Sequence, residues 1–230
     1  MVNIQNYITL SPTALSIVDT YAKPDQFSKD FKSIYESEKK SFLRHYIINN
    51  CPFVFQTSPI LFEQITQYLA DKIEINTSNI KLIGSAKTGF SISNPPDYGR
   101  PFGKKSDLDF SIIDEGVFYV LKDEFNLWAD KYSNKLITPT NQVSKFFWDN
   151  NLYEVPMYQL KNGFIDTYKI PNLDQFPVAQ KVNNALSLIV INLKNKYAIE
   201  VKSASARVYR SWNTFARQIK LNTEVILSKV

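Results

Sequence analysis

Two aspartates set two positions apart are the residues of this sequence best suited to hold a metal ion. Asp107 and Asp109 lie in the segment 106–113, where polar side chains alternate with apolar ones. Alternation with a period of two predicts a strand with one buried face. In such a strand both carboxylates lie on the same side, about 7 Å apart along the chain. Carboxylates this close repel unless a cation lies between them, and Mg²⁺ is usually held by one or two carboxylates together with substrate phosphates.

A glycine-serine pair precedes these aspartates and supplies groups that suit phosphate. The apolar run Ile80–Ile83 predicts a strand that ends at Gly84-Ser85. Glycine lets the backbone turn tightly and approach a ligand closely. The hydroxyl of Ser85 and the amides after it can donate to phosphate oxygens, especially where a helix begins at Ala86. We therefore expect a phosphate-binding turn here.

In this order the two features resemble the DNA polymerase beta-like nucleotidyltransferase superfamily. Its hallmark is a Gly-Ser turn after one strand and an Asp-x-Asp on the next, matched here by Gly84-Ser85 and by Asp107-Leu108-Asp109. The resemblance covers about a third of the chain. It implies transfer of a nucleoside monophosphate from a nucleoside triphosphate, with Mg²⁺ or Mn²⁺ on Asp107 and Asp109. Without the resemblance, the two aspartates could be a turn residue and an outward-facing strand residue.

The resemblance also implies a third carboxylate from a neighbouring strand, which would complete a two-metal site. Asp166, in a strand-like run, is the expected residue, and Glu200 and Glu154 are the alternatives. Asp166 could instead end a strand and pair with Lys161 or Lys169. If none of the three carboxylates reaches the metals, the site would be reduced or inactive.

The spacing between the two motifs is longer than small members of the family usually have, because 22 positions separate Ser85 from Asp107. The additional length falls in residues 93–105, which Pro and Gly predict to be a loop. This loop could close over a nucleotide or grip a second substrate, and a solvated surface loop is the alternative. The residues that we expect to contact the nucleotide are Gly84, Ser85, Lys87, Lys104, Arg207 and Arg210.

Composition excludes several other classes of chemistry. The chain has 230 residues, 44% of them hydrophobic and 21% charged, which indicates a globular protein with a substantial core. Its single cysteine, Cys51, cannot form an intrachain disulfide. Because the chain has only this cysteine and one histidine, His45, it cannot build a multi-His or Cys-rich zinc site. The sequence has no long apolar run and no signal-peptide pattern, so we expect no membrane association and a cytoplasmic location.

The pattern of elements predicts an α+β fold with a nucleotidyltransferase-like mixed sheet flanked by helices. We expect a helical amino-terminal part over residues 1–75, the core over 76–200 and a basic amphipathic helix over 201–230, all in one compact unit. Before that final helix, helical spacing and caps predict helices near residues 24–49, 58–73, 117–132, 141–149 and 174–193. Strands are expected at 77–83, 106–113, 153–160 and 164–170, the last two joined by a hairpin at 161–163.

Positive charge is concentrated at the carboxyl end of the sequence. Residues 181–230 carry nine Lys or Arg and two Glu, a balance of +7 against +5 for the whole chain. A helix over 203–230 would place Arg207, Arg210 and Arg217 in one basic stripe, which is typical of a surface that faces a polyanion. A solvated helix face is the alternative.

The basic stripe favours RNA, or several phosphates at once, as the acceptor. The family's other acceptors are proteins, a second nucleotide and small molecules such as aminoglycosides. Small stand-alone members often belong to bacterial toxin–antitoxin or phage-defence systems. The competing hypothesis is a catalytically inactive module that binds nucleic acid or a partner protein, and the sequence gives no indication of oligomeric state.

Overall fold

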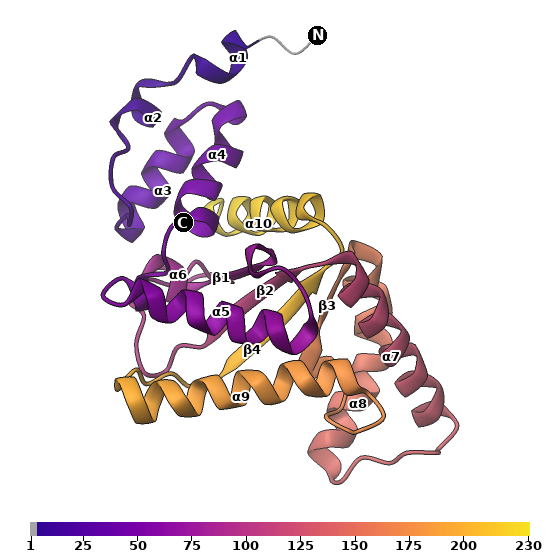
Figure 1. Cartoon of the computed structure of the whole chain (residues 1–230). Helices are drawn as coiled ribbons and strands as arrows, with labels where there is room; N and C mark the ends of the chain where they lie inside the picture. Colours follow the sequence, from indigo (N-terminus) through magenta and orange to yellow (C-terminus); the bar gives the residue numbers. More distant parts are fainter. Residues whose placement is uncertain (1–3) are drawn as a thin grey trace.

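A four-stranded mixed sheet lies at the centre of the computed structural model, which describes residues 4–230 (Figure 1). The strands are β1 (Ile80–Ile83), β2 (Leu108–Ile113), β3 (Phe164–Asp166) and β4 (Ala204–Tyr209), in the order β1-β2-β4-β3. β2 runs antiparallel to β1 and parallel to β4, and β3 runs antiparallel to β4. A mixed sheet flanked by helices confirms the predicted α+β fold class.

Two hydrophobic cores form, one on each face of this sheet. Side chains of β2 such as Leu108 and Phe110 face the first core, which α5 (Pro59–Ile73), α7 (Glu115–Ser133) and α9 (Pro177–Tyr197) complete. On the other face, Ile113 and Tyr209 pack against α10 (Trp212–Leu227) and the amino-terminal helices. Figure 1 shows α9 and α10 on opposite sides of the sheet. Because both faces are covered, a polar group on a central strand that has no partner within the protein carries the cost of its lost hydration.

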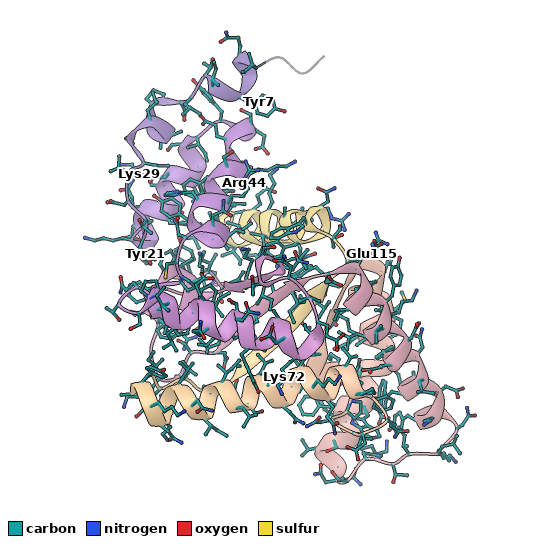
Figure 2. All side chains as sticks on the ribbon, in the orientation of Figure 1. Tyr7, Tyr21, Lys29, Arg44, Lys72 and Glu115 are labelled. Atoms are coloured by element: carbon teal, nitrogen blue, oxygen red, sulfur yellow. The ribbon has the colours of Figure 1, made fainter. Side chains whose placement is uncertain are left out.

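The amino-terminal part is helical, as predicted, but it is more divided than expected. Its helices are α1 (Gln5–Ile8), α2 (Pro12–Ser16), α3 (Pro24–Ser33) and α4 (Lys39–Leu43), and α4 continues into the π-helical segment Arg44–Asn49. The single helix predicted over residues 24–49 is therefore wrong, because the backbone becomes extended at Ile34 and Tyr35. Figure 2 labels Tyr7, Lys29 and Arg44 on these helices, of which α4 lies beside α10.

The strand predicted over residues 153–160 is wrong, and so is the hairpin after it. α8 (Gln142–Glu154) continues there into a π-helical segment, Val155–Gln159. Val155 and Gln159, four positions apart, are both buried, which is a helical repeat and not a strand repeat. The helical backbone ends at Gly163, whose φ of +76° suits glycine, and the strand that follows, β3, is shorter than predicted.

The helix predicted over residues 201–230 is wrong in its first part. Residues Ala204–Tyr209 form β4, which lies between β2 and β3, and only Trp212–Leu227 are helical, as α10. Arg210 and Ser211 separate the two elements, and the hydroxyl of Ser211 accepts from the amide of Thr214 as the N-cap of α10. The core sheet is therefore completed by residues beyond the predicted boundary at 200.

A buried carboxylate connects α7 to the beginning of α9. Glu124 accepts hydrogen bonds from the amides of Val178 (2.8 Å) and Ala179 (3.0 Å), in the first turn of α9. The first amides of a helix have no partner within the helix, and the positive end of the helix dipole favours an anion there. Glu124 therefore fixes the long helix that supports β4.

Within residues 4–230, no helix combines the length and the apolar character that crossing a membrane requires.

We expect Glu124→Ala to destabilise the fold by about 2–3 kcal/mol, because it leaves two amides of α9 without their partner in a buried position. Chemical denaturation of wild type and variant measures this loss. The matched control is Glu115→Ala, at the exposed start of α7. Equal stability of the two variants would contradict this role for Glu124.

Candidate functional site

The two aspartates of the Asp-x-Asp lie on the sheet face that α10 covers, and each has a serine as its partner. Ser203 Oγ donates to Asp107 Oδ1 (2.6 Å), and Ser205 Oγ donates to Asp109 Oδ1 (3.1 Å). The parallel pairing of β2 with β4 causes this, because Asp109 is directly opposite Ser205. Neither carboxylate forms an ion pair with any residue in 4–230, and both Oδ2 atoms accept no hydrogen bond from those residues.

The glycine of the Gly-Ser turn packs directly against one member of this acidic pair, Asp109. Gly84 follows β1 with φ +69° and ψ −159°, a backbone conformation that is essentially restricted to glycine. A Cβ at this position would lie 2.7 Å from Asp109 Oδ2. Ser85 then begins α6 (Ser85–Thr88), and its hydroxyl makes no hydrogen bond to a residue of the described chain. The two sequence motifs therefore converge on one place.

Burial and the neighbouring negative charge disfavour the ionised form of Asp109. Burial raises the pKa of Asp109, the bond from Ser205 lowers it, and the charge of Asp107 raises it further. Arg207 and Asp166 act more weakly and in opposite directions. A cation on Oδ2 would stabilise the ionised form, which burial and the Asp107 charge disfavour.

We expect Asp109→Asn to raise the melting temperature at pH 7 in EDTA by a few degrees. Between the ordinary aspartate pKa and the raised pKa of Asp109, the folded state binds more protons than the unfolded state, so stability falls as the pH rises through that window. The asparagine amide carries no charge and so avoids the cost of ionising a buried carboxylate. The gain in stability of the variant over wild type should therefore shrink as the pH falls below the raised pKa. Calorimetric melting across the pH range tests this, and a variant less stable than wild type at pH 7 would contradict it.

Asp166, the expected third carboxylate, is fully engaged elsewhere. Arg207 binds it with two bonds, from Nε to Oδ1 (2.6 Å) and from Nη2 to Oδ2 (3.0 Å). Gln159 Nε2 also donates to Oδ2 (2.9 Å), and Gln159 Oε1 accepts from the backbone amide of Asp166. Burial acts to lower the pKa of Arg207, but the bond and charge of Asp166 outweigh it and raise that pKa. The structure therefore gives Asp166 a structural ion pair in place of a free oxygen.

The two alternative third carboxylates also have other partners. Glu200 pairs with Lys104 and Glu154 pairs with Lys169, each at 2.9 Å. Over residues 4–230, no three or more His, Cys, Asp and Glu side chains are grouped so that they could share a metal ion. The free oxygens of Asp107 and Asp109 suit one divalent cation that completes its coordination with substrate phosphates and water.

Removing Asp166 should destabilise the fold, whereas removing Asp107 should not. Asp166→Ala leaves the partly buried guanidinium of Arg207 without its partner, and we expect a loss of about 3 kcal/mol. Among the described residues Asp107 has a single hydrogen-bond partner, at the surface, so we expect Asp107→Ala to change stability by less than about 1 kcal/mol. Urea denaturation of both variants measures this difference. If the Asp166→Ala and Asp107→Ala proteins are equally stable, the ion pair with Arg207 does not stabilise the fold, and Asp166 of the wild type could serve as a metal ligand.

The basic residues expected to bind the nucleotide lie in separate places. Lys87 is buried, and its Nζ donates to the backbone carbonyls of Ile48 and Asn50. Burial lowers the pKa of Lys87 to about 8. Lys104 is exposed and paired with Glu200, and Arg210 is exposed just beyond the end of β4. Of the predicted basic residues, only Arg207 influences the charge of Asp109.

Ser203 and Ser205 are site residues that the sequence interpretation missed. They repeat the two-residue spacing of Asp107 and Asp109, and this is the signal that could have revealed them. The sequence pattern predicts a helix for their segment, and residues two apart do not share a face of a helix. Recognition of the strand would have placed one hydroxyl opposite each carboxylate.

Comparisons with models of known protein families, with curated proteins and with solved structures found no match to this chain. The function must therefore be inferred from the side chains of the site and their surroundings. The convergence of Gly84, Ser85, Asp107 and Asp109 is the feature that any function has to explain.

Proposed function

We propose that this protein is a metal-dependent nucleotidyltransferase that moves a nucleoside monophosphate from a nucleoside triphosphate to an acceptor. One observation carries the proposal: Gly84 of the Gly-Ser turn packs directly against Asp109 of the Asp-x-Asp. A turn that can bind phosphate and two carboxylates that can bind a cation thus occupy the same end of β1 and β2. Phosphoryl and nucleotidyl transfer depend mainly on such positioning and on neutralisation of charge.

Each residue of the site has a defined task in this proposal. Asp107 and Asp109 would hold Mg²⁺ or Mn²⁺, which when bound supplies positive charge to the phosphates and lowers the pKa of an attacking hydroxyl. The hydroxyl of Ser85 and the amides of its turn bind outer phosphate oxygens. Ser203 and Ser205 orient the two carboxylates through the bonds at 2.6 and 3.1 Å. The charge of Arg207, which Asp166 holds in place, lowers the pKa of Asp109, and the charge of Asp166 opposes this effect.

The acceptor is RNA, a protein or a second nucleotide, and a cytoplasmic role in a toxin or phage-defence system remains part of this proposal. A second candidate function is favoured by one observation, the occupation of Asp166 by Arg207. Since this removes the expected third carboxylate, a catalytically inactive module that binds nucleic acid or a partner protein is the competing proposal.

Incubation with each α-labelled nucleoside triphosphate, Mg²⁺ and cell extract distinguishes these candidates, since only an enzyme transfers label to an acceptor. We expect labelling by wild type and a loss of about 100-fold in Asp107→Asn and Asp109→Asn, because the charge that holds the cation is removed. Asp149→Asn, at an exposed carboxylate of α8, is the matched control and should label normally.

Nuclease and protease treatment of the labelled product would identify the acceptor as RNA, protein or small molecule. Either aspartate variant retaining more than about a tenth of the activity would rule out the carboxylates as the cation site. Absence of label with every nucleotide would favour the binding module.

A further inference from the structure

A hollow of about 360 Å³ lies beside the Gly-Ser turn, between α6 and the carboxyl-terminal half of α10. Gly84 lines it, and Gly84 is also the residue that packs against Asp109. We propose that this hollow binds the base and sugar of the nucleoside triphosphate whose phosphates lie at Gly84 and Ser85. The inference rests on the proposed function and adds to it a binding site for the nucleoside.

The walls of the hollow have the composition that a nucleobase requires. Aliphatic side chains from the π-helical segment, β1, the loop after α6 and α10 form its apolar surfaces: Ile47, Ile83, Ile92, Ile219, Leu221, Val225 and Ile226. Side-chain amides and hydroxyls stand among them, from Asn94, Asn222, Thr88 and Thr223. A base is flat, with two apolar faces and an edge of hydrogen-bonding atoms, and small-molecule sites of ~300 Å³ upwards combine these same two kinds of surface.

The two asparagines have hydrogen-bonding capacity that the fold does not use. Asn94 Oδ1 accepts from Lys229 Nζ (2.9 Å), and Asn222 Oδ1 accepts from Gln218 Nε2 (2.8 Å). Each amide is therefore held at its oxygen, while neither Nδ2 donates to any residue in 4–230. An asparagine amide has two N–H donors on that nitrogen, which can bind acceptor atoms on the edge of a base.

Two segments far apart in the sequence supply most of the remaining lining of the hollow. Ile92 and Asn94 begin the long connection between the Gly-Ser turn and the Asp-x-Asp, and the other side is α10. Lys229 joins the end of α10 to Asn94, while Lys220 of α10 pairs with Glu36 at 2.6 Å. These contacts hold α10 in place above Gly84. A larger hollow of about 820 Å³ lies among the amino-terminal helices, but no candidate site residue lines it.

Calorimetric titration with two kinds of ligand, both in the presence of Mg²⁺, tests this assignment. The ligands are the four nucleoside triphosphates and inorganic tripolyphosphate, which has phosphates but no nucleoside. Asn222→Trp places a large ring in the hollow from an exposed position of α10, so the fold should tolerate it. We expect it to weaken binding of the preferred nucleoside triphosphate at least about tenfold and to change tripolyphosphate binding less than about twofold.

Two further variants sharpen the comparison. Asn94→Ala should weaken nucleoside triphosphate binding in the same selective way, because it removes donors to the base. Asn213→Ala, an exposed asparagine of α10 that does not line the hollow, should change neither ligand. If Asn222→Trp binds the nucleoside triphosphate as wild type does, or loses both ligands equally, the hollow is not the nucleoside site and the proposed function stands. If wild type binds neither ligand, both proposals fail.

Discussion

The antiparallel pairing of Ile83 with Asp109 determines where every other part of the candidate site can lie. This register places the last residue of β1 beside a carboxylate of β2, so the chain has to leave β1 directly above that carboxylate. A side chain on the next residue would collide with Asp109 Oδ2, and the required φ of +69° is itself unsuitable for most residues. Glycine at position 84 is thus a consequence of the sheet. A site positioned by backbone pairing in this way is more rigid than one built on loops.

The same sheet face contains carboxylates in two different energetic states. Asp166 has every oxygen paired, by Arg207 and Gln159, and it contributes to the stability of β3 and β4. Asp107 and Asp109 each have one hydroxyl partner and one oxygen that no residue of the described range 4–230 binds. Burial raises the pKa of Asp109, so the folded chain carries an electrostatic cost at that position. A cost that a bound cation would relieve is typical of a functional site, whereas the Asp166 pair has nothing left to gain from a ligand.

Features that depend on near neighbours in the chain were predictable from the sequence. The alternation around Asp109 and the glycine after β1 follow from local geometry, and both were correctly interpreted as strand and turn. β4 was missed because both of its faces are covered. Ala204 and Ala206 are small, and Val208 fits the apolar spacing of the helix that starts at Trp212. The sequence pattern of β4 and α10 together therefore predicts one long helix. The Asp166–Arg207 pair joins residues 41 positions apart, and no local pattern indicates it.

The position of β4 also weakens the inference from the positive charge of residues 181–230 to RNA as the proposed acceptor. The expectation of RNA rested on a helical stripe of Arg207, Arg210 and Arg217. Arg207 instead lies in the sheet, where Asp166 neutralises it, and Arg210 lies beyond the strand end, outside α10. On α10 itself, Lys220 is paired with Glu36 and Glu224. An ion-paired cation attracts a polyanion far less than a free one, so Arg207 and Lys220 give little support to RNA over a protein or a second nucleotide. If the proposed transfer takes place, its acceptor would have to be selected by the surface around Asp107 and Asp109.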